Sequence, residues 1–246
     1  MPCPRPEDTP WVHPIGHWRF CHRRQRAAQH APTGALRACL GSPLPSARQA
    51  VADCRFLAVD LETTGLDPEH DAILSIGWVA MDGVRIDLST ADQRLVRADC
   101  PVPEQSAVIH RITDREAAGG TTVDSALDAL FEALQGRVLV AHHAALELGF
   151  LEEACHRLYG VRPPLPVVDT LRLAERQLRR AGRPIPADGM RLHTLRGRYN
   201  LPQYRAHDAL FDALAAGELF AALVSQLSPE AQVPLERVLF RPGWLW

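Results

Sequence analysis

The residues of this chain that are best suited to take part in chemistry are two acids at the end of an apolar run. Arg55–Val59 has the composition of a short buried strand, and it leads directly into Asp60-Leu61-Glu62-Thr63-Thr64-Gly65. Side chains two positions apart on a strand point to the same side, so Asp60 and Glu62 are expected to lie together. Two carboxylates in such a place repel each other and lose hydration, which a cation between them would offset. For these two acids alone, the favoured interpretation is that they are solvated residues of a turn that ends the strand.

A second acid follows another predicted strand. Arg137–Ala141 is a candidate buried strand, and the helix predicted over Leu146–Tyr159 begins shortly after it. Glu147 lies in the first turns of this helix and could project back over the edge of the sheet. Considered alone, Glu147 is an ordinary acid at a helix N-terminus, where the helix dipole favours it. Considered alone, His142 and His143 are turn or core histidines.

A histidine and an acid about one helical turn apart make the third candidate. Asp208 is a suitable N-cap for a helix predicted over Ala209–Leu227, which places His207 just before the helix and Asp212 about one turn into it. A histidine close to a cluster of acids can titrate near neutral pH and act as a general base. In isolation, the same segment could be a cap followed by a surface acid.

The remaining pattern predicts the elements that position these groups. Three strands are expected first, over Phe56–Asp60, Ile73–Met81 and Val84–Leu88, with a hairpin turn at Asp82-Gly83. Apolar spacing predicts helices near Cys21–His30 and over Asp124–Leu134, Leu146–Tyr159, Leu171–Ala181 and Ala209–Leu227, with a short edge strand at Val167-Val168. Antiparallel strands followed by helices that alternate with short strands predict an α/β fold, in which helices cover both faces of one sheet.

Length and composition limit the class of molecule. At 246 residues, 46% of them hydrophobic, the chain can form one core of up to about 200 residues with extensions. We divide it into a basic, Pro- and Arg-rich extension at residues 1–50, a main domain at 51–227 and a short apolar tail at 228–246, which we expect to pack on the domain. No run approaches the ~18 apolar residues of a membrane span, and the N-terminus lacks a signal-peptide apolar region. We therefore expect a soluble cytoplasmic protein with no membrane partner.

The basic residues are unusual in kind and in distribution. All 27 are arginine, which excludes a Walker A phosphate loop, Schiff-base chemistry and a lysine general base. Residues 1–50 carry seven arginines against two acids, whereas the rest of the chain carries 20 against 27 and is too acidic for broad electrostatic binding of nucleic acid. The stretch from Arg172 to Arg205 is locally basic, and it could contact a phosphate backbone or could be a solvated helix face.

Taken in order along the chain, these residues resemble the histidine-containing branch of the DEDD exonuclease family, which includes the proofreading subunit of bacterial replicative DNA polymerase. The resemblance covers about residues 54–226 and extends beyond the acids. Ile109–Asp114 resembles the H-G-I-T segment of the family, Val168–Ala174 resembles its D-T-L-x-L-A helix start, and Leu195–Leu201 with Ala206–Ala209 resembles its closing motif. Several matches in the right order are more specific than any one of them.

The resemblance implies a ribonuclease-H-like fold, a mixed sheet flanked by helices, with two divalent metal ions, Mg²⁺ or Mn²⁺, at the carboxylates. By position, Asp60 would bridge both ions, Glu62 and Asp212 would complete the first site, Glu147 would bind the second ion and His207 would deprotonate the attacking water. Two such ions activate the water, stabilise the developing charge and support the leaving oxygen in phosphodiester hydrolysis. Carboxylates are the oxygen ligands that these ions prefer.

The same resemblance implies residues that contact the substrate. Thr63, Thr64 and Leu66 follow the first metal ligands, where members of the family hold the terminal nucleotide. His110 and Ile112 are also expected to contact the substrate, and the capping-box pattern at 113–116 marks the helix start that would place them. Without the resemblance, the threonines and Leu66 would be read as the turn that ends the strand.

One position departs from the family pattern. Where the family has N-A-x-F-D, this chain has His143-Ala144-Ala145-Leu146-Glu147. The ligand of the second metal would therefore be a glutamate, whose carboxylate lies about 1.5 Å further from the backbone than that of aspartate. We expect an active enzyme, because every other catalytic position is filled. Asp169 precedes a predicted helix and is expected to cap it rather than to bind metal.

The resemblance thus implies a metal-dependent 3′-to-5′ exonuclease that releases nucleoside monophosphates. Its expected substrate is the 3′ end of single-stranded DNA in proofreading or repair, with a polymerase or another repair protein as a possible partner. Two alternatives stay open. One is an exonuclease for RNA or short oligonucleotides, because nothing in the sequence reads the 2′-hydroxyl. The other is a nucleic-acid-binding or polymerase-associated module whose catalysis is impaired by Glu147.

Overall fold

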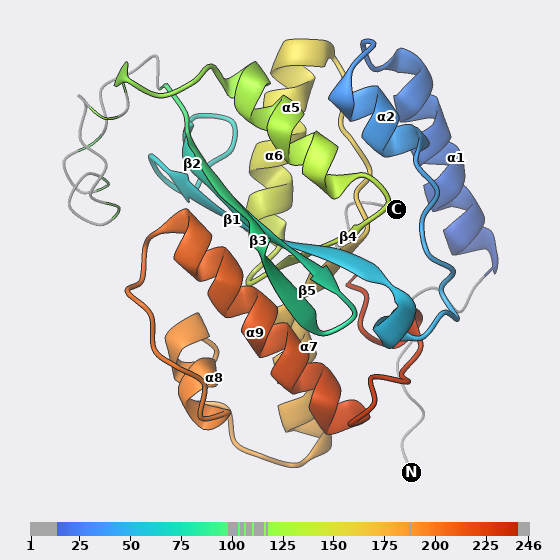
Figure 1. Ribbon diagram of the computed structural model, residues 1–246, viewed down its shortest axis with the longest axis vertical. Helices are drawn as coiled ribbons and strands as arrows, with labels where there is room; N and C mark the ends of the chain where they lie inside the picture. The colour runs from blue at the N-terminus through green and yellow to red at the C-terminus, as the bar shows by residue number, and fades with distance from the viewer. Residues whose placement is uncertain are drawn as a thin grey trace.

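The structure, a computed structural model, describes residues 14–97, 103, 106, 110, 116, 118–186 and 188–240. Its centre is a mixed five-stranded sheet in the order β3-β2-β1-β4-β5 (Figure 1). The strands are β1 Arg55–Thr63, β2 Ile73–Asp82, β3 Arg85–Leu95, β4 Val138–Ala141 and β5 Val167–Asp169. β1, β2 and β3 pair antiparallel, whereas β1, β4 and β5 pair parallel, so β1 lies at the centre with one neighbour of each kind.

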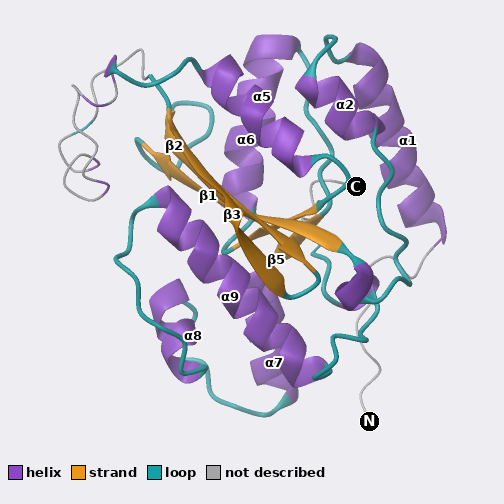
Figure 2. Ribbon diagram, in the orientation of Figure 1, coloured by secondary structure: helices purple, strands orange, loops and turns teal. Residues whose placement is uncertain are grey.

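Helices cover the sheet on both faces, as Figure 2 shows. One face carries α1 Pro14–His30, α2 Ala35–Gly41, α5 Val123–Leu134 and α6 Ala145–Tyr159. The other face carries α7 Thr170–Arg180, α8 Leu192–Arg198 and α9 Ala209–Leu227, with the short 3₁₀ helices η2 Val51–Asp53 and η3 Leu235–Arg237 nearby. This arrangement confirms the predicted α/β fold with a ribonuclease-H-like sheet.

The central strand divides its side chains between the two cores. Leu57, Val59 and Leu61 belong to the core under α5 and α6, whereas Phe56 and Ala58 belong to the core under α9. Because side chains alternate along a strand, the acids at positions 60 and 62 lie on the α9 face. The alternation of one strand therefore decides which helix the two carboxylates meet.

Most predicted elements are confirmed, and the differences have physical reasons. α9 begins and ends where the sequence predicts, and β1, β2, β4 and α5–α7 agree within a few residues. β3 was predicted to end at Leu88 but continues to Leu95, along a largely exposed stretch that lacks apolar alternation. α2 and α8 were not predicted, because seven residues are too few to show a helical period.

The segments before and after the predicted domain contribute to the cores. Val51 donates its backbone N–H to Val233, and Phe240 donates its N–H to Val167 at the edge strand β5. On the N-terminal side, the buried Arg24 of α1 donates to the carbonyl of Ser42, and this contact ties α1 to the end of α2. The division at residues 50 and 227 stays a prediction.

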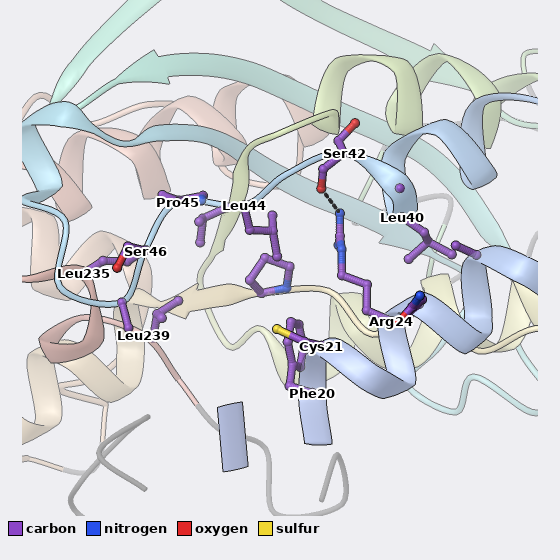
Figure 3. A pocket seen from close by; sticks show the side chains of 16 residues that line it. Phe20, Cys21, Arg24, Leu40, Ser42, Leu44, Pro45, Ser46, Leu235 and Leu239 are labelled. Carbon is purple, nitrogen blue, oxygen red and sulfur yellow. Dashed lines mark hydrogen bonds between the residues drawn. The ribbon is translucent and has the colours of Figure 1, made fainter. Parts of the chain in front are cut away.

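A cavity of about 420 Å³ marks the place where these two segments meet. Phe20, Cys21 and Arg24 of α1 face it from one side, and Leu235 and Leu239 face it from the other (Figure 3). It also reaches Val138 at the start of β4, whereas the predicted catalytic groups follow the opposite ends of β1 and β4. The cavity is thus separate from the predicted active site.

α9 is long and apolar enough to cross a membrane by length and composition alone. In this structure the side chains of Leu219, Phe220 and Leu223 are fully buried in the core on this face of the sheet, whereas Phe211 in the first turn is 45% exposed. Packing in the core accounts for the composition of the helix.

Candidate metal centre and active site

Three carboxylates converge where β1 meets the start of α9. Asp60, Glu62 and Asp212 can each place one oxygen so that these atoms lie within 4.8 Å of one another. Glu62 is only 4% exposed, and its Oε1 atom has no hydrogen-bond partner. Such close, dehydrated carboxylates repel unless a cation or protons lie between them. The structure therefore brings together the three residues predicted for the first metal site.

A glycine in β2 lets α9 approach this closely. Gly77 pairs with Asp60 across β1 and β2, and a Cβ atom on it would lie 2.2 Å from the backbone carbon of Ala209. No side chain fits at that distance, so the first residues of α9 rest directly on the strand. The side chain of Asp208 caps the helix by accepting the backbone N–H groups of Leu210 and Phe211, as the sequence predicted. One turn later, Asp212 faces the acids of β1.

His207 sits at the edge of the cluster. Its backbone has a positive φ of 65°, which turns the chain just before the helix. Its N–H donates to Oδ2 of Asp212 at 2.7 Å, so the histidine backbone and the carboxylate are held together. The imidazole itself is exposed. This position suits a base that must reach both the cluster and water.

His110 lies closer to the predicted metal ligands than the sequence indicated. Its Nδ1 atom is in ion-pair contact with Oε2 of Glu62, although the two atoms are not aligned as a hydrogen bond. Its ring also meets the ring of His207 edge to face, with centroids 5.8 Å apart. The predicted contact of His110 with substrate stays a prediction, and the close approach of its ring to Glu62 is a finding of the structure.

Glu147, the predicted ligand of the second metal, lies beside the cluster but outside the three-carboxylate group. It is 3% exposed in the first turn of α6, and its Oε2 atom has no hydrogen-bond partner. Nearby, Asp169 caps α7 and accepts the N–H of His143, as expected of a cap, but its Oδ2 atom is also without a partner. Two more buried carboxylate oxygens thus lack partners next to the group.

Burial and mutual repulsion shape the titration of these acids. Burial raises the pKa of Asp60 well above its usual value, and the charge of Glu147 raises it further. Burial likewise raises the pKa of Glu147 and of Asp212. In Asp169, burial raises the pKa while the N–H groups that the carboxylate accepts oppose the rise. A divalent cation would offset the free-energy cost of burial and of charge repulsion, because it replaces the lost hydration and supplies the missing counter-charge.

The donor set fits hard divalent ions. Asp60, Glu62, Asp212 and Glu147 offer only oxygen, which Mg²⁺ and Mn²⁺ prefer. The unpartnered oxygens of Glu62 and Glu147 are buried, and buried polar atoms nearly always have partners. The residues present therefore fit the metal ions that the sequence predicted.

The predicted substrate residues differ in their surroundings. The hydroxyl of Thr63 donates to the carbonyl of Gly65, and that of Thr64 donates to Asp71, so both are engaged within the loop after β1. Leu66 is 79% exposed and free to contact a ligand. Ile112 lies outside the described residues. The substrate contacts of all these residues stay predictions.

One residue of the basic stretch is not at the surface. Arg196 is 2% exposed and forms an ion pair with Glu218 at 2.6 Å, and its guanidinium lies 4.7 Å from the centroid of the Tyr204 ring. It joins α8 to α9 and cannot contact a phosphate backbone, so the prediction was wrong for this residue. Arg172 and Arg179 are exposed but both pair with Glu175.

Sequence reasoning missed two features of the site. The sequence could have predicted the role of Gly77, because a glycine inside a buried strand often marks the close approach of another backbone. No sequence pattern predicts the contact between His110 and Glu62, because these residues are 48 positions apart and belong to no common element.

The sheet order, the helices on both faces and the acidic cluster with its histidine define an exonuclease of the ribonuclease-H-like class. The sequence profile of RNase_T, described as Exonuclease, matches residues 57–220, so the chain belongs to this exonuclease family. Dependence on divalent metal ions is typical of the family.

Individual relatives agree with this assignment. DNA polymerase III subunit epsilon of Treponema pallidum is 31% identical over 172 residues, which cover 69% of this chain and 76% of that subunit. A DNA polymerase III of the PolC type from Thermotoga maritima is 28% identical, over 71% of this chain but only 12% of that protein. Exonuclease X in complex with 5′-overhanging duplex DNA shares the fold, with a TM-score of 0.56 and 22% identity over 74% of this chain and 99% of that one. The chain thus spans only a small part of several relatives, down to 11% of their length.

Proposed function

We propose that this protein is a metal-dependent 3′-to-5′ exonuclease that removes nucleoside monophosphates from the free 3′ end of DNA. The observation that carries the proposal is the group of three carboxylates, Asp60, Glu62 and Asp212, within 4.8 Å of one another and with His207 at its edge. Membership of the RNase_T family supports the reaction class.

The chain's acids would hold two divalent ions, Mg²⁺ or Mn²⁺. Asp60, Glu62 and Asp212 would hold the first, and Asp60 with Glu147 would hold the second. When bound, such ions activate water and stabilise the charge that develops on the phosphate. Glu147 enters this set from the first turn of α6, and its buried carboxylate already acts electrostatically on Asp60.

His207 would act as the general base. Its exposed ring can reach a water molecule in front of the scissile phosphate, while its backbone N–H holds it against Asp212. The imidazole accepts the proton of the attacking water and releases it to solvent after hydrolysis. The neighbouring carboxylates stabilise the imidazolium that forms in between.

The substrate would enter past the loop after β1. Leu66 is exposed there and would pack on the last base, while Thr63 and Thr64 shape the loop through their hydrogen bonds. His110, which contacts Glu62, would also contact the terminal nucleotide, and we assign the same role to Ile112 from the sequence. None of these residues is assigned to the 2′-hydroxyl, so the proposed contacts do not by themselves separate DNA from RNA.

The names of the relatives favour DNA. Two of them are DNA polymerase III proteins, and the structural neighbour is an exonuclease with DNA bound. We therefore place this protein in proofreading or repair in the cytoplasm, acting on a single-stranded 3′ end with a polymerase or another repair protein as its partner. The alternatives are an exonuclease for RNA or short oligonucleotides, and a binding module in which Glu147 impairs catalysis.

Digestion of 5′-labelled DNA and RNA of one sequence tests the proposal. The full chain is incubated with Mg²⁺ or Mn²⁺, beside Asp60→Asn and the exposed control Glu230→Gln. We expect a ladder that shortens from the 3′ end of DNA, that requires metal, and that only Asp60→Asn abolishes. Faster digestion of RNA would support the first alternative. Retained binding of intact DNA under every metal condition would support the second, and Glu147→Asp should then restore cleavage.

A further inference from the structure

Two histidines and an acid converge beside the three-carboxylate group. Glu62, His110 and His207 can each place one ligand atom so that these atoms lie within 4.8 Å of one another. The His110 ring contacts Glu62, and it meets the ring of His207 edge to face. Two imidazoles and a carboxylate therefore surround one point next to the hard-ion cluster.

We propose that these three side chains form a separate, nitrogen-rich metal site for Zn²⁺, and that an ion bound there inhibits hydrolysis. Zinc is commonly held by three protein ligands drawn from histidine and carboxylate, with a fourth position open to water. Magnesium prefers oxygen alone, so it favours the neighbouring carboxylates. The inhibitory part of this inference rests on the function proposed above, whereas the site itself does not.

The spacing of the three side chains suits a zinc ion. Bonds of about 2.0–2.1 Å in a tetrahedron place ligand atoms about 3.3 Å apart. Atoms that already lie within 4.8 Å reach this spacing by small rotations of side chains. The ring of His207 is exposed and can make such a rotation without disturbing the core.

Unpartnered atoms give an independent reason to expect a ligand. Glu62 is 4% exposed and its Oε1 atom has no hydrogen-bond partner, and the buried Nδ1 atom of His110 also lacks one. Buried polar atoms without partners are rare in folded proteins because each costs free energy. An ion between the imidazole and the carboxylate would satisfy both.

The proposed site shares two residues with the catalytic machinery. Glu62 belongs both to this group and to the three carboxylates. His207 is the proposed base, and a bound ion would occupy the nitrogen lone pair that must accept the proton. Zinc bound here should therefore stop hydrolysis even while the substrate and the hard ions are present.

Crossed variants separate this site from the carboxylate cluster. The full chain is titrated calorimetrically with Zn²⁺ and, separately, with Mn²⁺, and Co²⁺ provides a visible spectrum as a substitute for zinc. His110→Gln and His207→Gln should each weaken zinc binding by at least about tenfold, the scale seen for changes around bound metals. Neither should change Mn²⁺ affinity. Asp212→Asn should weaken Mn²⁺ binding and leave zinc binding in place.

His156→Gln is the matched control, because it removes an exposed imidazole in the last turn of α6. It should leave both titrations unchanged. The proposal is overturned if neither His110→Gln nor His207→Gln weakens zinc binding, or if Asp212→Asn weakens it as much as they do. The use of two histidine variants, one of them at an exposed side chain, keeps the test valid if one variant folds poorly.

An activity assay tests the inhibition separately. Zinc is added to a Mg²⁺-supported digestion, and inhibition is expressed relative to the zinc-free rate of each protein. The wild type should be inhibited at zinc concentrations far below that of magnesium, and the residual activity of His110→Gln should resist zinc at least about tenfold better. Zinc binding without any nuclease activity would overturn the proposed function and leave the site standing. Activity that zinc does not inhibit would overturn the inhibitory role alone.

Discussion

At the scale of single residues, the acids of the site cost stability in the absence of metal. Asp60 and Glu147 are placed where they lose hydration and repel each other, and burial raises the pKa of both. A carboxyl group whose pKa is raised on folding binds more protons in the folded state, so stability falls as the pH rises through its titration. The cluster thus lowers the stability of the metal-free protein, and the cations that we propose to bind there would offset this cost.

The variant Asp60→Asn should therefore stabilise the metal-free protein at neutral pH. We expect a rise in Tm of at least about 2 °C, because removal of one charge from this half-buried, repelling cluster relieves on the order of 1 kcal/mol. Mn²⁺ should raise the Tm of the wild type but not of this variant. Thermal unfolding with and without Mn²⁺ measures both effects, and Glu230→Gln, at an exposed position of the tail, controls for net charge. A lower Tm of the metal-free variant would contradict this account of the cluster.

The burial of Glu152, away from the site, leads to a similar prediction about stability and pH. It is 5% exposed on α6, and burial raises its pKa to about 7, while Arg162 and Arg23 partly oppose the rise. Since the folded pKa exceeds the ordinary value of 4.5, the charged form is penalised and stability falls between about pH 4.5 and 7. Glu152→Gln should be close to wild type in Tm at pH 5 and more stable at pH 8. An equal difference at the two pH values would show that the charge is not the cause.

The residues of the site differ in how far the sequence predicts them. Strand alternation predicts that Asp60 and Glu62 lie together, and a helix cap predicts the places of His207 and Asp212, whereas the catalytic roles proposed for these four residues come from the resemblance to the family. The distance of Glu147 from the others depends on how α6 packs against the sheet, which no local pattern encodes. The same holds for His110, whose contact with Glu62 is made only in the folded chain.

At the scale of elements, the site depends on how closely α9 lies on β2. Gly77 allows the contact between the strand and the first residues of the helix, where a Cβ atom would lie within 2.2–2.4 Å of backbone atoms. Gly217, further along α9, is less crowded, and a Cβ atom there would lie 3.3 Å from side-chain atoms of Ala58 and Met81. The two glycines thus support one interface at its catalytic end and at its middle.

Alanine at these two positions should have different effects. Gly77→Ala forces the start of α9 away from β1 and carries Asp212 and His207 with it, so we expect a loss of Mn²⁺ affinity and of cleavage of at least about 100-fold, the scale set by a displacement of 1 Å. Gly217→Ala also perturbs packing and should lower Tm, but it should leave Mn²⁺ affinity within about threefold. Calorimetry and thermal unfolding of both variants separate positioning from stability. Equal losses of Mn²⁺ affinity in the two variants would contradict the role of Gly77 in positioning α9 at the site.

The sequence predicted those helices and strands that bury apolar residues at a regular spacing. α9 and β2 have long apolar patterns and were found with nearly correct ends. β3 was predicted too short because it lies at the sheet edge and exposes polar residues on most positions, which removes the period that a buried strand shows. α8 is too short for a period and is held instead by Arg196, a tertiary contact.

At the scale of the whole molecule, the described parts of the N-terminal extension and of the tail close the cores. Leu36 and Leu40 of α2 are buried beneath α5, and Leu235 and Leu239 are buried next to the cavity that α1 also lines. Full burial of one such side chain contributes about 1.5–3 kcal/mol. Four of them together are comparable to the whole stability of a typical domain, about 5–15 kcal/mol.

A chain cut to residues 51–227 should therefore fail to reach the stability of the full chain, even though it contains every proposed catalytic residue. We expect a loss of cooperative unfolding or a Tm lower by at least about 10 °C, because removal of several buried leucines costs several kcal/mol and each kcal/mol shifts Tm by about 2–4 °C in a domain of this size. Binding of a hydrophobic dye should rise, since α5, the start of β4 and the edge strand β5 become exposed. A chain of residues 14–240, which keeps every contact named here, is the control. If the 51–227 chain unfolds at the same temperature as this control, the extension and the tail are accessories to a domain that is complete without them.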